Sequence, residues 1–441
     1  MSTPNLRSRS WVPDDSEQLI QRVAGEVAGA QPTETASRIG ALITTNARIH
    51  ERECINLNPA ANVMSPAAEA ALATSLGTRP SLGYPGAKYE MGLEAVETIE
   101  IITAELAAEV FDAAFAEVRI GSGALANLYG FMATCRPGDS IIVPPATVAG
   151  HVTHNADGAA GLYGLDIHEA PIDADRYTID VEALRRLAHD VRPSLITVGT
   201  SLNLVHHPVS EIRAIADEVG AKVLFDAAHL SGLIAGRAWP NPLHEGAHAM
   251  TMSTYKSLAG PAAGLLVTND AAIAERVDAI AFPGLTANFD AGNTAALAIT
   301  LLDWQQHGEA YASEMAASAS TLASALIAAG VPVVTVDGVP SRSHAFAVRA
   351  DCTGGDGHAL ALHLRRAGLL TSGIGLATDP GDSMGGIRIG TNEMARWGMT
   401  STHMEKVGDL VARAIVTSQP ESLAAEVADF RSGFDRVHFC S

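Results

Sequence analysis

The sequence is poor in aromatic and basic residues, and each shortage excludes a class of protein. Aromatic residues make up 5% of the 441 residues, which argues against an aromatic-lined groove for a polymer. Lysine and arginine total 29 against 49 acidic residues, so the formal net charge is −20. A surface this acidic repels phosphate backbones and anionic lipid headgroups. We therefore expect no nucleic acid and no membrane among the partners.

Cysteine is also scarce. Cys54, Cys135, Cys352 and Cys440 lie far apart and include no Cys-x-x-Cys pair. This spacing predicts neither a disulfide framework nor a metal cluster, so we expect no metal site. No run of about 18 apolar residues could span a membrane, and the amino-terminal residues lack the apolar core of a signal peptide. We expect a cytoplasmic protein.

What the chain does have is a repeated strand–helix pattern between about residues 55 and 305. Val209–Val219 carries apolar residues at helical spacing, and Gly220 predicts the end of that helix. Such helices alternate with short apolar runs that predict strands at Glu117–Ile120, Ser140–Val143, Ser194–Gly199, Lys222–Phe225 and Gly264–Thr268. This alternation is typical of an α/β fold with a mostly parallel sheet.

The patterns divide the chain into three parts. Residues 1–50 predict an amino-terminal arm and helix, 51–305 a large domain, and 306–441 a smaller carboxy-terminal α+β domain. A helical stretch from Asn293 to about Ala329 lies between the last two. The last part has strand signals at Val331–Val336, His344–Val348 and Ile387–Ile389, and helix signals at Gly357–Ala367 and Thr400–Val416. In such a fold we expect a ligand at the carboxyl ends of the strands, near the domain junction.

Lys256 is the first candidate for chemistry. It follows an apolar run and precedes a turn rich in small residues, and Asp226 and His229 stand upstream at the end of a predicted strand. A lysine amine forms a Schiff base with an aldehyde, and a carboxylate pairs with a protonated pyridine nitrogen. The combination predicts a site for pyridoxal 5'-phosphate (PLP). Taken alone, Asp226 is explained equally well as a helix N-cap.

Three further patterns fit such a site. Ser122, Gly123 and Ala124 lie between a predicted strand and a predicted helix, where free amide groups favour an anion such as the cofactor phosphate. His151 follows a strand, so its ring could lie flat on the pyridine. Arg388 stands between two β-branched residues in a predicted strand, and an inward arginine there needs an anion. That anion is a substrate α-carboxylate or the partner in an internal salt bridge.

Together these residues resemble the serine hydroxymethyltransferase family, which has the aspartate-aminotransferase-like fold of PLP enzymes. The resemblance runs from about Asn56 to about Met399, and its motifs include Gly83-Tyr84-Pro85-Gly86 and Ser253–Pro261. It implies a large domain with a mostly parallel, seven-stranded type of sheet, and a smaller domain. It also implies roles for single residues: Lys256 as the Schiff-base lysine, Asp226 at the pyridine nitrogen, His151 on the ring, and Ser122, Gly123, Ala124, Ser201, His229, Ser253 and Asn288 at the cofactor, with Arg388 and Tyr89 at the substrate.

The chain departs from the family at residues that handle protons. Leu82 stands where the family has a glutamate before Tyr-Pro-Gly, and leucine neither donates nor accepts a proton. Glu90 replaces the second tyrosine after that motif; it either takes over the proton transfer or is a solvated loop carboxylate. Tyr255 replaces the histidine before the lysine and is a further candidate proton carrier. Asn288 aligns with the glycine pair that reaches the neighbouring subunit's phosphate.

We therefore expect a PLP-dependent enzyme that cleaves the Cα–Cβ bond of a β-hydroxy amino acid such as threonine or serine. The chemistry would be retro-aldol cleavage or aldol transfer through a glycyl quinonoid, without folate. The Tyr-Pro-Gly and Phe-Pro-Gly motifs resemble the threonine aldolase and transaldolase branch. Three alternatives stay open: a folate-dependent serine or α-methylserine hydroxymethyltransferase, an amino-acid racemase or epimerase, and a non-catalytic PLP-binding module. The expected partners are an amino acid, an aldehyde and further copies of the chain, in a homodimer or homotetramer with shared active sites.

Overall fold

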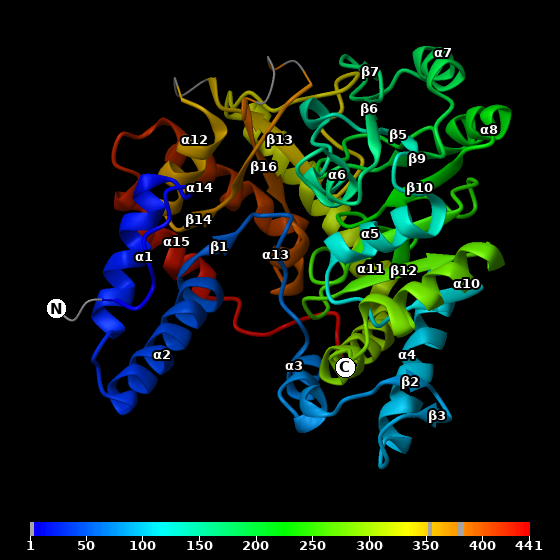
Figure 1. Cartoon of the computed structure of the whole chain (residues 1–441). Helices are drawn as coiled ribbons and strands as arrows, with labels where there is room; N and C mark the ends of the chain where they lie inside the picture. Colours follow the sequence, from blue (N-terminus) through cyan, green and yellow to red (C-terminus); the bar gives the residue numbers. More distant parts are fainter. Residues whose placement is uncertain (1–3, 352–354, 378, 380–382) are drawn as a thin grey trace. The chain divides into compact units, whose positions relative to one another are not determined.

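The computed structural model describes residues 4–351, 355–377, 379 and 383–441 (Figure 1). The chain divides into two compact units, Met1–Cys54 and Ile55–Ser441. The first unit consists of α1 (Asp14–Val27), α2 (Pro32–Ala47) and a π-helical turn (Arg48–Glu53). An ion pair between Arg38 and Glu26, with 2.6 Å between Nη2 and Oε2, joins its two helices.

The second unit contains a seven-stranded sheet in the order β4-β12-β11-β10-β9-β5-β6. Its strands are β4 (Phe115–Glu117), β5 (Ser140–Val143), β6 (Asp166–Glu169), β9 (Leu195–Val198), β10 (Lys222–Asp226), β11 (Ala249–Ser253) and β12 (Gly264–Thr268). Strands β11, β10, β9, β5 and β6 are parallel to one another, and β12 is antiparallel to both β11 and β4. The α/β fold with a mostly parallel sheet is confirmed, and the sheet is a mixed one.

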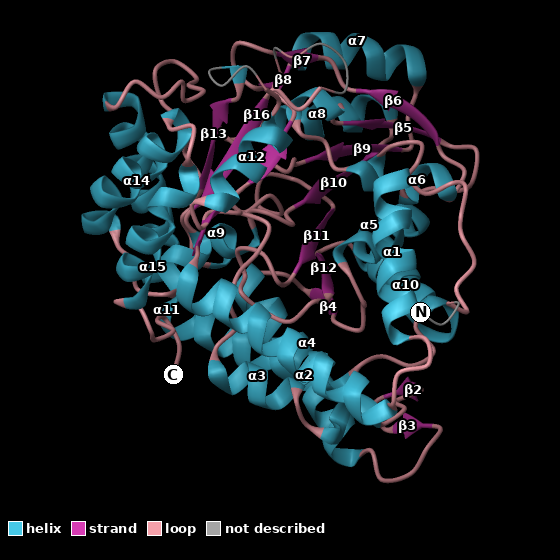
Figure 2. Ribbon diagram, turned by 90° about the vertical axis from the view of Figure 1, so that its left-hand side faces the viewer, coloured by secondary structure: helices cyan, strands magenta, loops and turns pink. Residues whose placement is uncertain are grey.

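Helices cover both faces of this sheet, so its strands are apolar on both sides (Figure 2). Because successive side chains of a strand point to opposite faces, Leu195 packs with one core while its neighbour Ile196 packs with the other. Leu224 and Phe225 of β10 divide in the same way. The covering helices are α4 (Glu94–Phe111), α5 (Gly123–Thr134), α6 (Ala159–Leu162), α7 (Val181–Val191), α8 (Val209–Val219), α9 (Ser231–Ala235), α10 (Ala271–Ala279) and α11 (Ala291–Ala328).

A three-stranded sheet has a separate core. Its order is β13-β16-β15, and it packs with α12, α14 and the carboxy-terminal half of α11. The bounds are β13 (Ala345–Arg349), β15 (Ser372–Ile374), β16 (Gly386–Gly390), α12 (Gly357–Arg366), α13 (Asn392–Arg396), α14 (Met404–Val416) and α15 (Ala424–Ser432). The remaining short elements are α3 (Pro66–Leu72) and the strand pairs β1 (Ile55–Asn56) with β14 (Leu369–Leu370), β2 (Gly83–Tyr84) with β3 (Ala87–Lys88), and β7 (Ile172–Asp173) with β8 (Thr178–Ile179).

Most predicted elements are present, and two are wrong. Helix α8 has the predicted bounds and ends at Gly220, whose φ of 78° suits glycine. The strand predicted at Glu117–Ile120 is instead β4, which ends at Glu117, because the amide of Arg119 binds the side chain of Glu117 and not β12. The strand predicted at Val331–Val336 is absent from the described elements. Its Pro332 has no amide hydrogen, and only single bridges form nearby.

The predicted boundary at residue 305 falls inside α11, which runs without interruption from one core to the other. The division into 51–305 and 306–441 therefore stays a prediction. Within the described part of the chain, no helix combines the length and apolar character needed to cross a membrane.

Candidate active site

The candidate residues converge at the carboxyl edge of the large sheet. Asp226 is the last residue of β10 and Ser253 the last of β11, and the two strands are parallel neighbours. Lys256 lies in the turn that follows β11 and is 5% exposed. Parallel strands end at the same edge, so two residues far apart in sequence are brought together.

Burial has a direct chemical consequence for Lys256. Burial lowers the pKa of the amine most, the charge of Asp226 opposes the change and the charge of Arg388 adds to it, so the pKa is about 8. An ordinary lysine titrates near 10.5. Near neutral pH a useful fraction of Lys256 is therefore the neutral amine, the form that attacks an aldehyde.

Asp226 is held by a network of hydrogen bonds. His154 Nε2 lies 3.0 Å from Asp226 Oδ2, Asn127 donates to the same oxygen (2.8 Å), and the amide of Ala228 donates to Oδ1 (3.0 Å). Burial alone would raise the pKa of Asp226, but the bonds from His154 and Asn127 hold it well below its usual range. The carboxylate is therefore ionised. It accepts three bonds of the roughly four that a carboxylate can take, which leaves a place for a pyridinium N–H.

His151 is tied to the same network through Thr153. Its Nδ1 lies 2.9 Å from Thr153 Oγ1, which accepts a bond from Asn127 (2.9 Å). Burial lowers the pKa of His151 to about 4, and the charges of Asp226, Lys256 and Arg388 all act on it. His151 is thus a neutral ring among the other candidates, as stacking on a cofactor requires.

The amino-terminal end of α5 lies against β11. Ser122 caps the helix, because its Oγ accepts a hydrogen bond from the amide of Leu125 (3.2 Å). Gly123 follows, and a Cβ at this position would collide with Ser253 Oγ. The close approach therefore requires glycine. It places the partial positive charge of the helix end, including Ala124, beside the strand that leads into Lys256.

Arg388 is a half-buried cation with neutral partners. Its Nε donates to Ser372 Oγ (2.8 Å), and its Nη1 donates to the carbonyl of Ser201 (3.0 Å) and lies 3.2 Å from His229 Nε2. Among the described residues, no carboxylate forms an ion pair with it. Burial lowers the pKa of Arg388 to about 10 and that of His229 well below its ordinary value.

Tyr255 also lies at this site, whereas no contact in the described chain joins Tyr89, Glu90 or Asn288 to Lys256, Asp226 or Arg388. The Lys256 amine is 6.0 Å from the centre of the Tyr255 ring. Tyr89 and Glu90 follow the β2–β3 hairpin, which lies beside α4 at the lower edge of the second unit, whereas β16 with Arg388 lies in its upper half (Figures 1 and 2). Tyr89 contacts Phe282, with 6.2 Å between ring centres. Asn288 Oδ1 accepts the amide of Ser81 near the same hairpin.

Four residues of the network were missed by sequence reasoning: Asn127, Thr153, His154 and Thr251. Thr251 donates to Asn127 Oδ1 (2.6 Å), so it orients the amide that holds Asp226. The available signal was Asn127, a polar residue in the otherwise apolar stretch Ala126–Phe131 of α5. It stands one helical turn after Gly123 and therefore on the same face of the helix.

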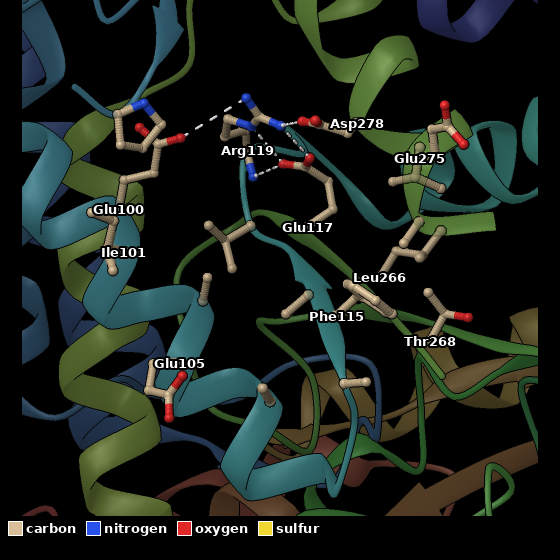
Figure 3. Close-up of a pocket in the computed structure, with 18 of the residues that line it drawn as sticks. Glu100, Ile101, Glu105, Phe115, Glu117, Arg119, Leu266, Thr268, Glu275 and Asp278 are labelled. Atoms are coloured by element: carbon tan, nitrogen blue, oxygen red, sulfur yellow. Dashed lines mark hydrogen bonds and ion pairs between the residues drawn. The ribbon is translucent and has the colours of Figure 1, made fainter. Parts of the chain in front are cut away.

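A cavity of about 590 Å³ lies elsewhere, between α4, β4, β12 and α10 (Figure 3). Arg119 Nη2 is 2.6 Å from both Glu117 Oε2 and Asp278 Oδ1, and Lys88 Nζ is 2.6 Å from Glu100 Oε2. These five charges thus have opposite partners within the described chain. None of the candidate residues lines the cavity, so we place the functional site at Lys256.

A mixed seven-stranded sheet with a buried lysine and aspartate at its carboxyl edge, and a half-buried arginine from the smaller sheet whose charge acts on that lysine, is typical of PLP-dependent enzymes that act on amino acids. A family model for serine hydroxymethyltransferase matches residues 35–411. The chain belongs to the serine hydroxymethyltransferase family.

Relatives with names in this family include aldolases. An alpha-methylserine aldolase of Variovorax paradoxus is 57% identical over 441 residues, 100% of this chain and 99% of the relative. An alpha-methylserine aldolase of Ralstonia sp is 52% identical over 436 residues, 98% and 99% of the two chains. A serine hydroxymethyltransferase of Pyrobaculum islandicum is 36% identical over 390 residues, 88% and 90% of the two. The prediction of an aldolase-type enzyme of this family is confirmed; the threonine aldolase branch is not tested.

Proposed function

We propose that the protein cleaves an α-alkyl-β-hydroxy amino acid, with α-methylserine as the first substrate to test, into an amino acid and an aldehyde without folate. Cleavage of the Cα–Cβ bond of α-methylserine releases formaldehyde, and a proton added at Cα gives alanine. The Cα of this substrate carries no hydrogen, so racemisation cannot begin on it. The relatives named above support this substrate class.

The observation that carries the proposal is the state of Arg388. A guanidinium that has lost part of its hydration and has no carboxylate partner is costly unless an anion binds to it. Its Nη2 has no hydrogen-bond partner among the described residues, while Nη1 and Nε are held in place by Ser201, His229 and Ser372. The free edge of such a fork suits the α-carboxylate of an amino acid. The charge of Arg388 acts on Lys256 and His151, so the carboxylate would lie next to them.

The residues around Lys256 fit PLP. Lys256 would bind its aldehyde, Asp226 its pyridine nitrogen and His151 its ring face. Ser122, Gly123, Ala124 and Ser253 would hold its phosphate, and Ser201 and His229 its ring hydroxyl. When bound, PLP supplies an electron sink for the negative charge left at Cα. The buried His229 Nδ1 has no partner in the described chain, which leaves a hydrogen-bonding position for that hydroxyl.

We further propose that Glu90 takes the proton of the substrate hydroxyl in a neighbouring subunit, and that Asn288 and Tyr89 also act across the interface of a homodimer or homotetramer. Within one chain these residues lie near α4 and not near Lys256. Glu90 Oε2 is buried without a hydrogen-bond partner among the described residues. A carboxylate in that state is a candidate base. Tyr255, beside the lysine, remains the candidate within one chain.

The same proposal covers the domain arrangement. We propose a large PLP-binding domain and a smaller carboxy-terminal α+β domain, with the three-stranded sheet and its separate core as support. In this arrangement Arg388 comes from the smaller sheet, and Lys256 and Asp226 come from the larger one. The substrate would bind where the two meet.

The test is turnover of α-methylserine by the PLP-loaded protein with no folate added. We expect formaldehyde and alanine in equal amounts, and their loss in Lys256→Ala. Formaldehyde transfer that requires tetrahydrofolate would instead support a hydroxymethyltransferase. Exchange of the α-proton of alanine or serine in D2O, with α-methylserine left intact, would support a racemase.

The contribution of Glu90 across subunits is tested by mixing. Lys256→Ala and Glu90→Gln should each be inactive alone. If the site is shared, unfolding and refolding the two variants together restores activity, because mixed dimers contain one site with both native residues. No recovery in verified mixed dimers contradicts the shared site. Glu94→Gln, at the start of α4, is the matched control and should keep its activity.

A further inference from the structure

The carboxy-terminal residues 438–441 bind along α11 and α13 (Figure 1). The amide of His438 donates to the carbonyl of Arg396 (2.7 Å), and Arg396 in turn donates to the carbonyl of Phe439. The amide of Ser441 donates to Asp303 Oδ1 (3.3 Å). Arg396 and Asp303 form a buried ion pair of 3.1 Å, so the segment is bound to a rigid part of the fold.

Phe439 is the central residue of this segment. Its φ is 56°, a left-handed conformation that is unfavourable for a phenylalanine. A strained residue persists only where the surrounding contacts determine its position. Here its ring stacks on that of Tyr311, with 5.0 Å between ring centres and 18° between planes. The strain therefore places an aromatic ring on Tyr311.

Tyr311 connects this ring to the active-site turn. Its hydroxyl donates to the carbonyl of Asn392 (2.8 Å) and accepts a hydrogen bond from Asn62 Nδ2 (2.9 Å). Tyr311 is 1% exposed, and burial raises its pKa to about 12, so the hydroxyl keeps its proton. Asn62 Nδ2 also donates to the carbonyl of Lys256 (2.9 Å). One amide group thus joins Tyr311 to the backbone of the lysine.

A second aromatic residue of α11 holds the same turn. Trp304 lies 5.1 Å from Tyr311 between ring centres, and its Nε1 donates to the carbonyl of Leu258 (2.7 Å). The turn from Lys256 to Leu258 is therefore held from behind at two carbonyls. One bond comes from Trp304 and the other from Asn62, which also donates to Tyr311. Phe439 is the outer, half-buried layer of this aromatic cluster.

We propose that Phe439 is a positioning residue for Lys256, acting through Tyr311 and Asn62. The carboxy-terminal segment packs against the face of the Tyr311 ring and limits its sideways movement, so the hydroxyl is held in place, and Asn62 transmits that position to the lysine backbone. A lysine that must meet an aldehyde at bonding distance depends on such positioning, because small displacements of a reacting group reduce rates strongly. The inference rests on Lys256 as the cofactor lysine, not on which substrate is turned over.

The experiment compares Phe439→Ala with Phe434→Ala, a matched control in the same carboxy-terminal region. The Phe434 ring contacts His403 and Phe430, and no ring contact joins it to Tyr311 in the described chain. The first readout uses cofactor-free protein. An amine-reactive reagent labels Lys256 at a series of pH values, and mass spectrometry of the lysine peptide gives the midpoint. We expect Phe439→Ala to raise the midpoint above that of the parent, since a loosened turn buries the amine less.

The second readout uses the PLP-loaded protein. We expect Phe439→Ala to lower kcat about tenfold, the effect of losing one buried hydrogen bond, with KM little changed. Tyr311→Phe keeps the ring stack and removes only the hydroxyl, and it should reproduce both effects. The double variant should be no worse than either single one, because both act through one connection. Phe439→Tyr keeps a flat ring and should therefore have the same labelling midpoint and the same kcat as the parent.

Phe434→Ala should move neither readout. Equal losses of melting temperature in Phe439→Ala and Phe434→Ala, with the Lys256 midpoint unchanged in both, would overturn the proposal. If Phe439→Ala does not fold, Phe439→Leu keeps the apolar contact without the flat ring and is judged by the same midpoint. The midpoint needs no substrate, so an inactive parent on α-methylserine would contradict the proposed function and leave this test intact.

Discussion

Two halves of the candidate active site differ in how their charges are compensated. Around Asp226, three donors bind the carboxylate, and Asn127 uses both ends of its amide to join Asp226, Thr153 and Thr251. Around Arg388, the described partners are a hydroxyl, a carbonyl and an imidazole, all of them neutral. The first half is nearly complete without a ligand, and the second is incomplete.

The difference extends to the neighbouring histidines. His344 is 1% exposed, and neither of its ring nitrogens has a hydrogen-bond partner within the described residues. Burial, with a smaller contribution from the charge of Arg388, lowers its pKa to about 4. Neutral imidazoles leave the positive charge of Arg388 uncompensated. We infer that the Asp226 half is built to orient a resident cofactor and the Arg388 half to attract a substrate that comes and goes.

The largest loss of activity is expected from removing the negative charge of the Asp226 half. Asp226→Asn keeps the size of the side chain but leaves His154 and Asn127 with a neutral partner. Breaking one member of a buried charged network costs about 3–5 kcal/mol, or roughly a thousandfold in kcat/KM when the charge is used in the reaction. Steady-state kinetics at saturating PLP measures it. Asp217→Asn, an exposed partner of Arg213, is the control, and activity of Asp226→Asn within tenfold of the parent would contradict the assignment.

Removing the charge of the Arg388 half should reduce activity but increase the stability of the fold. Arg388→Leu removes a half-buried cation that has no carboxylate partner among the described residues. We expect kcat/KM to fall about a hundredfold, mainly through KM, because charge-assisted hydrogen bonds to the substrate are lost. We also expect the cofactor-free protein to melt a few degrees higher, since a half-buried charge without an opposite partner is gone.

Arg396, an arginine that is fully buried, is the matched control for this prediction. Arg396 is paired with Asp303, so Arg396→Leu leaves a buried carboxylate without its partner and should lower the melting temperature. Differential scanning calorimetry of both variants without PLP makes the comparison. A fall in melting temperature for Arg388→Leu as large as that for Arg396→Leu would refute the contrast between the two halves.

A smaller effect tests whether the Asp226 half acts as a network. Thr251→Val removes the hydroxyl that orients the Asn127 amide and keeps its shape. We expect about a tenfold loss of kcat/KM, the size of one buried hydrogen bond. Asn127→Ala should cost more, since it removes bonds to three partners. If Thr251→Val has the same effect in the Asn127→Ala background as in the parent, the two residues are independent and the network interpretation fails.

Sequence reasoning identified the charged residues of both halves. It missed the polar residues that hold Asp226 in place. Lys256, Asp226 and Arg388 stand in local patterns: a small-residue turn, the end of an apolar run and an alternating strand. Asn127 and Thr251 bind each other across 124 positions of sequence, and no local pattern records such a bond. The position of Glu90 was equally hidden, because a single chain places its hairpin beside α4 and away from Lys256.

The fold shows the same limit. Helix α8 could be predicted to the residue because a periodic apolar face and a terminal glycine lie within its own sequence. Strand β4 ends earlier than predicted because its end depends on a side chain. Glu117 Oε1 accepts the amide of Arg119, which therefore does not bind β12. Strand β6 at the sheet edge was not predicted, since Asp166–Glu169 is polar and half-exposed, and only its parallel pairing with β5 makes it a strand.

The smallest expected effect is on the pKa of Lys256, which depends on both halves. Burial lowers the pKa of the lysine most, the charge of Asp226 raises it and the charge of Arg388 lowers it, and together these effects give a pKa of about 8. The rate at which cofactor-free protein captures PLP should follow the neutral amine. It should rise about fivefold from pH 7 to 8 and level off near pH 9, whereas an ordinary lysine would continue to rise to about pH 10.5.

Variants of the two halves should move this plateau in opposite directions. Arg388→Leu removes a positive neighbour, so the amine holds its proton more tightly and the plateau moves to higher pH. Asp226→Asn removes a negative neighbour and moves it to lower pH. Stopped-flow absorbance after mixing with PLP measures both, with Lys256→Ala as the blank. Shifts in the same direction would mean that Asp226 and Arg388 do not both act on Lys256, and would contradict a single site that contains all three residues.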